Sequence, residues 1–373
     1  MKNNRTFLEK LLNGAEVEWK LLSLVSEMQR GKTITAKSTN EGKIPVISGG
    51  QKPAYYHSES NRDGKTITVA GSGAYAGYIM YWEEPIFVSD AFSIKTDESL
   101  LQIKYVYHFL LQNQQKIYAM KKGSGVPHVY PKDIGTLTIP IPPLSVQTEI
   151  VKILDALTAL TSELTSELIL RRKQYEYYRE KLLSEEELGK VGFEWKPLGE
   201  VTNIKTGQAV SKYSISQNPG IYPVINSGRE PLGFINEWNT ENDPIGITTR
   251  GAGVGSITWQ EGKYFRGNLN YSVTVKSDYK LNIRFLYHIL LHFQKEIHNL
   301  CSFTGIPALN ASELKKLEIS IPAIEEQQRI VSILDKFETL TNSITEGLPL
   351  AIEQSQKRYE YYRELLLNFP GRE

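Results

Sequence analysis

Apolar side chains recur at a helical spacing through residues 150–182. Steps of four and three residues alternate there, and eight of the ten positions are apolar or aromatic: Ile150, Leu154, Leu157, Thr161, Leu164, Leu168, Arg171, Tyr175, Tyr178 and Leu182. This alternation is a heptad seam, which predicts a long helix that packs along one face against another helix. A helix over residues 144–188 would run about 65 Å at 1.5 Å per residue.

A second seam occupies the end of the chain and contains an interruption. It begins at Ile330, Leu334, Phe337, Thr341, Ile344 and Leu348, and after four extra residues it resumes at Tyr359, Tyr362 and Leu366. Gly347 and Pro349 lie at the interruption, which predicts a kink near residues 347–350. We expect the two long helices to pack on each other, antiparallel if two similar units are related by a two-fold axis.

The segments between the seams alternate short β-branched runs with glycine-rich turns. Residues 65–81 (KTITVAGSGAYAGYIMY) and 244–259 (PIGITTRGAGVGSITW) each predict a strand, a glycine-rich turn and a second strand. Residues 104–120 and 283–300 follow a helical pattern. The fold class is therefore α+β, with two similar globular domains joined by long coiled-coil-like helices.

The chain repeats itself with a shift that grows from 176 to 184 residues. Residues 18–20 (EWK) recur at 194–196, 153–155 (ILD) at 333–335, and 175–180 (YEYYRE) at 359–364. Two copies are too few for a solenoid, so they predict a pseudo-two-fold internal repeat. The predicted parts are a helical lead (1–13), a first globular domain (14–143), a central long helix (144–188), a second globular domain (189–321) and a C-terminal long helix (322–373).

Two proline-containing segments that open the long helices carry a family resemblance. Residues 140–155 (PIPPLSVQTEIVKILD) and 320–335 (SIPAIEEQQRIVSILD), with the two YEYYRE helix ends, resemble the specificity subunits of Type I restriction-modification systems. Gln147 lacks the glutamate that precedes Gln327 as Glu326, a small departure from the pattern. The order of globe, helix, globe and helix covers nearly the whole chain, and the two globes would be the family's target-recognition domains.

The resemblance implies a sequence-specific DNA-binding subunit that is not itself an enzyme. Its target would be bipartite double-stranded DNA, with one half-site for each globe. Its partners would be two methyltransferase subunits and the restriction subunits, on which S-adenosylmethionine, ATP and Mg are expected, while this chain binds no cofactor. The helix surfaces away from the seam would dock the methyltransferases, with the candidates Tyr177, Arg179, Tyr361 and Arg363.

Net charge and composition are compatible with this interpretation but do not establish it. The formal net charge is +1, but the globes carry +2 (14–143) and +3 (189–321) while residues 144–188 carry −3. A weakly basic globe fits DNA binding but is common on any protein surface. No apolar run approaches the roughly 18 residues that a membrane span needs, and the single cysteine, Cys301, excludes an internal disulfide. We expect a cytoplasmic protein.

The sequence contains no complete catalytic or phosphate-binding motif. The glycine-rich segments 71–77 and 251–256 lack a full G-x-G-x-x-G that opens a helix, and no G-x-x-x-x-G-K-[ST] is present. His288 and His292 have a spacing that could bind a metal, but the first copy has Gln112 in place of the second histidine. Packing or surface roles are favoured for these histidines, so no metal site is predicted.

Loops that mix base-reading and phosphate-binding side chains are the candidate DNA contacts. The first globe offers residues on segments 47–52 and 120–130, and the second offers residues on four glycine-containing or basic loops. The candidates are Ser48, Gln51, Lys52, Lys121, Lys122, Ser124, His128 and Tyr130 in the first globe, and Asn226, Arg229, Arg250, Arg266, Asn268, Asn270 and Thr304 in the second. Each is also compatible with an ordinary surface or turn role.

Two other functions remain compatible with the residues alone. One is a stand-alone enzyme that acts on nucleic acid with a dispersed active site. The other is a helical scaffold whose globes bind protein. Methyltransferase or nuclease activity of the isolated chain would favour the first, and absence of binding to duplex DNA would favour the second.

Overall fold

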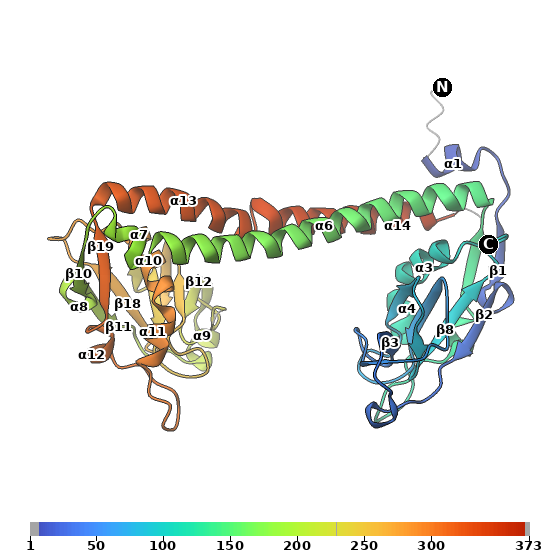
Figure 1. Cartoon of the computed structure of the whole chain (residues 1–373), viewed down its shortest axis with the longest axis horizontal. Helices are drawn as coiled ribbons and strands as arrows, with labels where there is room; N and C mark the ends of the chain where they lie inside the picture. The colour runs from blue at the N-terminus through green and yellow to red at the C-terminus, as the bar shows by residue number, and fades with distance from the viewer. Residues whose placement is uncertain (1–6, 229, 370–373) are drawn as a thin grey trace. The chain divides into compact units, whose positions relative to one another are not determined.

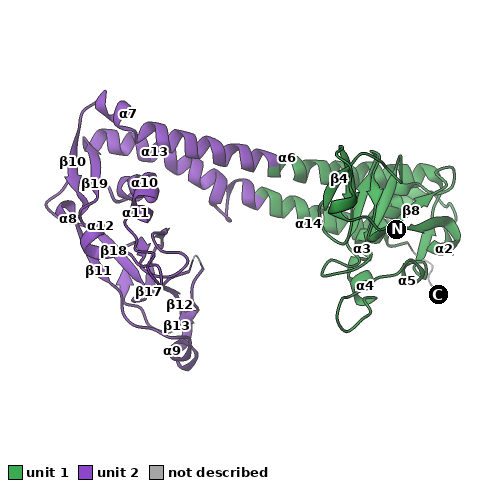
Figure 2. Cartoon of the chain, turned by 60° about the horizontal axis from the view of Figure 1, so that its bottom comes forward, with its two compact units in different colours: residues 1–165, 351–373 green, residues 166–350 purple. Residues whose placement is uncertain are grey.

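The computed structural model describes residues 7–228 and 230–369, and the chain divides into two compact units (Figure 2). Unit 1 comprises residues 1–165 and 351–373, and unit 2 comprises residues 166–350. Each unit therefore combines one globe with a stretch of α6 (Leu144–Leu182) and a stretch of the C-terminal helices, α13 (Ile324–Asn342) and α14 (Gly347–Leu367). Within the described residues, no helix is long and apolar enough to cross a membrane.

The globe of unit 1 is built on a four-stranded antiparallel sheet in the order β2-β8-β5-β6. One face carries Ile67 and Val69, which pack in the main core with helix α3 (Ile103–Gln112). The opposite face packs on a small sheet in the order β4-β3-β7 through a second cluster around Ile47 and Val88. Coverage of both faces explains why every residue of β5 is buried. The strands are β2 (Ser26–Arg30), β3 (Ile44–Ile47), β4 (Tyr55–His57), β5 (Thr66–Ala70), β6 (Ile79–Trp82), β7 (Phe87–Val88) and β8 (Ala91–Thr96).

The globe of unit 2 repeats this architecture. Its larger sheet has the order β11-β18-β15-β16, and its smaller sheet has the order β13-β12-β17-β14. In both small sheets one strand pair is parallel: β3 with β7 and β12 with β17. The strands are β11 (Thr202–Thr206), β12 (Pro219–Ile225), β13 (Phe234–Ile235), β14 (Thr240–Glu241), β15 (Ile245–Thr248), β16 (Ile257–Trp259), β17 (Lys263–Arg266) and β18 (Asn270–Val275).

Short elements complete each unit. A two-stranded ribbon leads from each globe into its long helix, formed by β1 (Glu18–Leu21) with β9 (Thr138–Ile141) and by β10 (Phe193–Pro197) with β19 (Glu318–Pro322). The predicted helices 104–120 and 283–300 are each two helices that break at Asn113 and Phe293. The shorter helices are α1 (Phe7–Leu12), α2 (Leu22–Val25), the 3-10 turn η1 (Ala36–Ser38), α4 (Gln114–Ala119), α5 (Pro131–Ile134), α7 (Glu185–Gly189), α8 (Leu198–Val201), α9 (Lys212–Gln217), α10 (Ile283–His292), α11 (Gln294–Asn299) and α12 (Ala311–Leu314).

The long helices pack along the predicted seam. All ten seam positions of α6 are buried or half-buried. In unit 1 the hydroxyls of Thr161 and Ser355 lie 2.8 Å apart, and in unit 2 Tyr178 stacks on Phe337 at 5.5 Å between ring centroids. α6 ends at Leu182 rather than at 188, because Ser184 caps the separate helix α7.

The C-terminal helix is interrupted, as the extra residues indicated. α13 ends at Asn342 and α14 begins at Gly347, with residues 343–346 outside both helices. Gly347 has a φ of 83°, and a Cβ at this position would lie 2.6 Å from the carbonyl oxygen of Thr339. Only glycine tolerates both the positive φ and this close approach.

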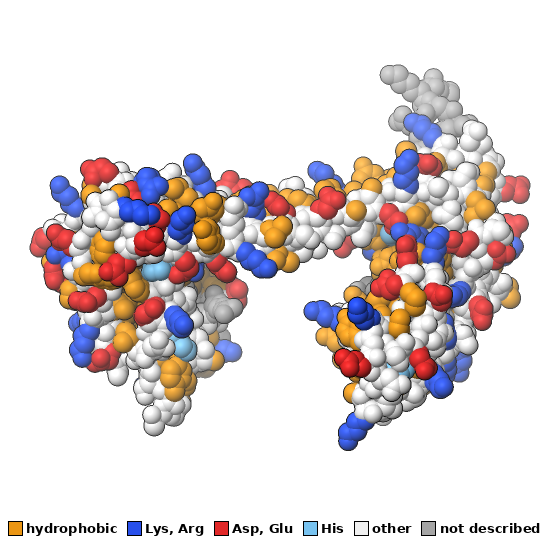
Figure 3. All heavy atoms as spheres, viewed as in Figure 1, with side chains coloured by type: hydrophobic (Ala, Val, Ile, Leu, Met, Phe, Trp, Pro, Cys, Tyr) orange, Lys and Arg blue, Asp and Glu red, His pale blue; other side chains and the backbone are white. Residues whose placement is uncertain are grey.

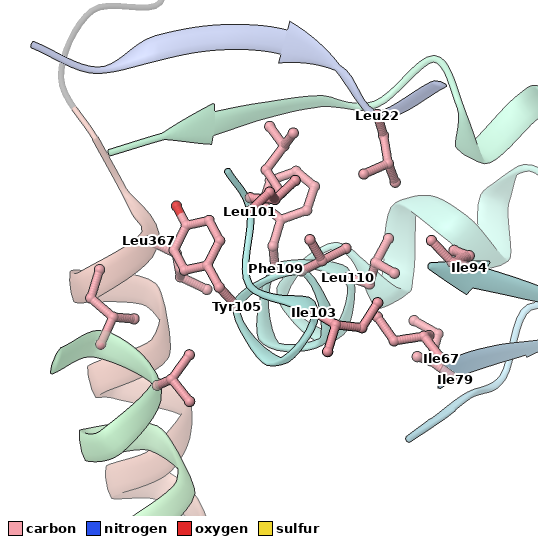
Figure 4. Packing of buried hydrophobic residues seen from close by; sticks show 14 of the residues in the cluster. Leu22, Ile67, Ile79, Ile94, Leu101, Ile103, Tyr105, Phe109, Leu110 and Leu367 are labelled. Carbon is pink, nitrogen blue, oxygen red and sulfur yellow. The ribbon is translucent and has the colours of Figure 1, made fainter. Parts of the chain in front are cut away.

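The core of unit 1 joins the globe to the long helices (Figure 4). Leu367 of α14 lies near Tyr105 of α3, and the same cluster contains Ile150 and Leu154 of α6. Figure 1 shows α3 and α10 between the sheets and the long helices of their own units. These two helices therefore connect the globe and the helices within each unit.

Candidate nucleic-acid interface and the globe–helix joint

Three loops meet at one end of the sheets in unit 1. They are residues 47–54, 71–78 and 120–130, and we call them the three-loop surface of unit 1. The Gly73 amide donates to the Pro127 carbonyl at 2.9 Å, and the Val129 amide donates to the Gly71 carbonyl at 3.0 Å. Gly49 of the first loop packs against Ser72 of the second. A Cβ at Gly49 would lie only 2.6 Å from the Ser72 carbonyl oxygen, so the two loops are in direct contact.

Unit 2 builds the same arrangement from residues 225–228, 230–233, 249–256 and 300–310, which we call the three-loop surface of unit 2. The Gly251 amide donates to the Pro307 carbonyl at 3.0 Å, and the Leu309 amide donates to the Thr249 carbonyl at 2.8 Å. A Cβ at Gly253 would lie 3.1 Å from the Ser227 carbonyl oxygen. The backbone scaffold is therefore common to both units, while the side chains that it presents differ.

All eight predicted residues of the first globe lie on or beside its three-loop surface. Gln51, Lys52, Lys122 and Ser124 are exposed, and the other four are half-buried: Ser48, Lys121, His128 and Tyr130. The Lys122 ammonium lies 2.7 Å from Asp133, so its charge is already partly balanced.

An arginine that the sequence did not single out joins this group. Arg30 lies over the Tyr130 ring at 5.5 Å, and Tyr130 stacks on His128 at 6.0 Å between ring centroids. The sequence offered no signal for Arg30, because it ends a strand rather than standing in a basic loop. The stack places a cation and two rings beside the predicted loops.

The predicted residues of the second globe separate into exposed and buried groups. Arg250, Asn268 and Thr304 are exposed, while Arg229 lies outside the described residues. Asn226, Arg266 and Asn270 are buried, with exposed fractions of 8%, 3% and 0%.

The buried group holds the globe together instead of facing solvent. The Arg266 guanidinium donates to Asn270 Oδ1 at 2.6 Å, to the Ile245 carbonyl at 3.1 Å and to the Asp243 carbonyl at 2.7 Å. Asn226 Oδ1 accepts the Leu269 amide at 2.9 Å. These three side chains therefore support the loops, and we leave them out of the interface proposed below.

Neither unit presents a continuous basic face in the view of Figure 3, where Lys and Arg are interspersed with Asp and Glu. This distribution agrees with the small net charges of the globes. Attraction to phosphates therefore explains little of the selectivity for a DNA sequence. The geometry of the loops is the better candidate for its source.

A buried glutamine fastens each globe to the start of its long helix. Gln147 Oε1 accepts the Gln102 amide at 2.9 Å, and its Nε2 donates to the Pro142 carbonyl at 2.8 Å. Gln327 does the same with the Asn282 amide at 2.8 Å and the Pro322 carbonyl at 2.8 Å. The glutamine thereby provides a partner for the backbone amide of the residue that caps the N-terminus of α3 or α10, which no intrahelical carbonyl can reach.

A second contact, centred on a buried histidine, links three segments in each unit. His108 Nε2 lies 2.9 Å from Asp155 Oδ1, and its Nδ1 lies 3.0 Å from the Tyr359 hydroxyl. In unit 2, His288 Nε2 lies 2.7 Å from Asp335 Oδ1, and its Nδ1 lies 3.4 Å from the Tyr175 hydroxyl. With the glutamine, this Tyr–His–Asp chain forms what we call the globe–helix joint.

Comparison with known proteins identifies the architecture. The model of the Type I restriction modification DNA specificity domain matches residues 16–171 and again 190–354. A putative type I restriction enzyme specificity subunit from Haemophilus influenzae is 40% identical over 99% of this chain and 100% of its own length. The chain belongs to the family of Type I restriction-modification specificity subunits. The specificity subunit recognises the DNA target and is not itself catalytic.

Further relatives agree over the full length. The EcoR124I/EcoR124II specificity subunit of Escherichia coli is 32% identical to this specificity subunit, covering 98% of this chain and 97% of that one. The crystal structure of the Type I S subunit from M. genitalium matches with a TM-score of 0.68 at 21% identity, over 96% of this chain and 98% of that chain. The two target-recognition domains and the packed long helices are thus those of the family fold.

Of the four residues predicted to dock partners, the two tyrosines are exposed, whereas the two arginines lie over neighbouring tyrosine rings. Tyr177 and Tyr361 are exposed at 59% and 62% in the specificity subunit. Arg179 lies over the Tyr175 ring at 5.6 Å and Arg363 over the Tyr359 ring at 5.0 Å, so both arginines fold back on the joint. The structure adds Leu170, exposed at 60%, which lies seven residues and therefore two turns before Tyr177 on α6.

One acidic cluster has metal-like geometry, but an arginine already pairs with both of its carboxylates. The ligand atoms of His288, Asp335 and Glu338 lie within 4.8 Å of one another. The Arg284 guanidinium donates to both carboxylates, at 2.7 Å to Asp335 and 2.7 Å to Glu338. His288 and His292, whose spacing alone could suit a metal, contact different carboxylates: His288 lies beside Asp335, and His292 lies 2.7 Å from Glu180. A resident metal is therefore not proposed.

Proposed function

We propose that each unit of this specificity subunit reads one half of a bipartite DNA target through its three-loop surface. The observation that carries the proposal is the repetition of this surface on one backbone scaffold with different exposed side chains. Unit 1 presents Gln51, Lys52 and Ser124, whereas unit 2 presents Arg250 and Thr304, with Asn268 on the adjacent connection between β17 and β18. Lys and Arg suit phosphates and guanine, and Asn and Gln suit adenine, so the two surfaces would select different bases.

The long helices would dock two methyltransferase subunits, one on each unit. Leu170 and Tyr177 form an exposed apolar strip on the part of α6 in unit 2, and Tyr361 is exposed on α14 in unit 1. Large apolar side chains exposed on a helix are typical of protein interfaces. On this proposal S-adenosylmethionine binds the methyltransferase subunits, and ATP with Mg binds the restriction subunits, so the specificity subunit holds no cofactor.

Methylome sequencing tests the reading of half-sites. A host that expresses this chain with its methyltransferase subunits gives the target, and the substitution Arg250→Ala should change or relax bases in one half only. Lys316→Ala is the matched control, because Lys316 is an exposed cation of unit 2 on the turn before β19 and should leave the target unchanged. Altered bases in both halves would overturn the proposal.

Co-purification tests the docking surface. Tyr177→Glu places a charge on the apolar strip and should weaken retention of the methyltransferase subunit at least tenfold, by the cost of burying an unpaired charge. Glu176→Gln is the control, since Glu176 is the exposed neighbour on the same helix. Equal retention by both variants would place the docking surface elsewhere.

A further inference from the structure

An exposed carboxylate, that of Asp90, borders all three loops of the three-loop surface of unit 1. Asp90 lies on the short connection between β7 and β8, and it is exposed. Its backbone carbonyl accepts the Gly71 amide at 3.1 Å, which ties Asp90 to the second loop of the surface. No sequence motif surrounds Asp90, so residue pattern alone does not single it out.

Both oxygens of the Asp90 carboxylate have defined neighbours. Ser72 Oγ donates to Asp90 Oδ2. A Cβ at Gly49 would lie 3.7 Å from Oδ2, and a Cβ at Gly71 would lie 3.5 Å from Oδ1. The carboxylate therefore stands between the first two loops, where glycines leave it room, and it lines a pocket of about 180 Å³ together with Arg30, His128 and Tyr130.

No cation forms an ion pair with this carboxylate within residues 7–228 and 230–369, where Ser72 donates its side-chain hydrogen bond. On a surface that approaches DNA, an unpaired carboxylate is repelled by phosphates. It is favourable only where it faces a hydrogen-bond donor, and the donors on base edges are exocyclic amines. Cytosine N4 and adenine N6 are the major-groove donors, and guanine N2 is the minor-groove donor.

We propose that Asp90 selects one base of the half-site bound by unit 1 by accepting a hydrogen bond from that base's exocyclic amine. This inference rests on the proposed function, since it requires the three-loop surface of unit 1 to contact DNA. Ser72 is a positioning residue, because its hydroxyl holds one carboxylate oxygen and leaves the other available.

Unit 2 differs at the corresponding connection, which agrees with a role in selectivity. The Thr249 amide donates to the Leu269 carbonyl at 2.9 Å, as the Gly71 amide does to Asp90 in unit 1. By this hydrogen bond Leu269 corresponds to Asp90, so unit 2 has no carboxylate here, and the exposed residue beside Leu269 is the amide Asn268. Asn both donates and accepts hydrogen bonds and pairs best with adenine, so the two units would impose different requirements at this place.

The test uses the complex of the specificity subunit with its methyltransferase subunits, on the target found by methylome sequencing. Competition binding is measured with duplexes in which a single base loses only its amine: purine for adenine, 2-pyrimidinone for cytosine or hypoxanthine for guanine. We expect one such change, in the half-site of unit 1, to weaken binding by about tenfold, within the range for a specific base contact. Which of the three replacements has this effect identifies the base.

Substitutions of the protein connect that position to Asp90. With Asp90→Ala the amine-containing and amine-free duplexes should bind equally, whereas Glu84→Gln, an exposed acid on the turn between β6 and β7, should keep the wild-type preference. Asp90→Asn retains an acceptor for Ser72 and should shift the base preference at the same position without loss of overall binding. This variant covers the case in which Asp90→Ala disturbs the loops.

Three outcomes overturn the inference, and they differ from failure of the proposed function. The wild-type complex could lack an amine-sensitive position in this half-site, or Asp90→Ala could keep the wild-type preference. Asp90→Asn could also weaken binding equally on all duplexes, which would show that Asp90 only braces the loop. Failure of the proposed function would appear differently, as wild-type binding without sequence preference, and the inference would fall with it.

Discussion

His108 Nε2 lies 2.9 Å from Asp155 Oδ1, and this contact joins the globe of unit 1 to its long helix. The equivalent pair in unit 2, His288 and Asp335, has a distance of 2.7 Å. Both histidines are almost completely buried, with exposed fractions of 1% and 0%. The contact repeats in both units although the surrounding helices differ in sequence. The histidine–aspartate pair is therefore a shared feature of the globe–helix joint in both units.

The joint should weaken in acid because of these two carboxylates. Burial opposes the charge on Asp155 and Asp335, but hydrogen bonds from the histidines, and from Lys104 and Arg284, outweigh it and lower the pKa of both carboxyls. A carboxyl whose pKa is lower in the folded state stabilises the fold above its unfolded value, 3.8, and loses that contribution as the pH falls through the folded value.

Urea unfolding measured between pH 6 and pH 2.5 checks this prediction. Stability should decline below about pH 4, and the double variant Asp155→Asn with Asp335→Asn should show a shallower decline. The same slope in the variant and the wild type would mean that other groups cause the acid sensitivity.

Gln327 should matter more to unit 2 than any ordinary polar residue of the helix. Gln327→Ala leaves the Asn282 amide without its partner, and an unsatisfied buried amide costs about 1–3 kcal/mol. Hydrogen exchange of α10 should therefore accelerate, while the exchange of α3 in unit 1 should stay unchanged. Gln328→Ala is the matched control, because Gln328 is the exposed neighbour. Equal acceleration by both variants would contradict this role.

Much of the helical architecture could be predicted because periodicity constrains it directly. The four–three spacing identified the buried face of α6, and Gly347 with Pro349 indicated the interruption between α13 and α14. Gln147 and Gln327 stood out as family signatures, but their hydrogen bonds to the globes could not be foreseen, since these join residues 45 positions apart.

The candidate interface was harder to predict, because residue type does not reveal the direction of a side chain. Arg266 and Asn270 belong to types that read bases, yet the fold turns them inward, where the Arg266 guanidinium donates to Asn270 Oδ1 and to the Ile245 carbonyl. Asp90 belongs to a type that phosphate repels, and only its place between two glycine-containing loops makes it a candidate. Such assignments depend on contacts between segments that are distant in the sequence.

Exchange of one globe should change one half of the target. Replacing residues 189–321 with the corresponding segment of a relative substitutes the three-loop surface of unit 2 and leaves that of unit 1 intact. Methylome sequencing should then show one altered half-site and one retained half-site. Changes in both halves would show that the globes do not read independently.

Lengthening α6 should lengthen the unread spacer of the target. Four residues inserted near Thr161 nearly complete one helical turn and extend the helix by about 6 Å at 1.5 Å per residue. Methylome sequencing should give unchanged half-sites and a spacer longer by about one or two base pairs, at 3.4 Å each. An insertion of two residues is the control, because it rotates the seam out of phase and should abolish methylation. Normal methylation with an unchanged spacer would exclude a ruler role for α6.

The division of the chain between the units has a consequence for synthesis on the ribosome. Unit 2 is continuous, from 166 to 350, whereas the core of unit 1 includes Leu366, Leu367 and Phe369 from the end of the chain. Domains usually fold in the order of their synthesis. Here the unit that begins first must finish last, since its core closes only when the final helix has emerged. A nascent chain would therefore complete its second globe while the first still lacks part of its core and needs protection from aggregation.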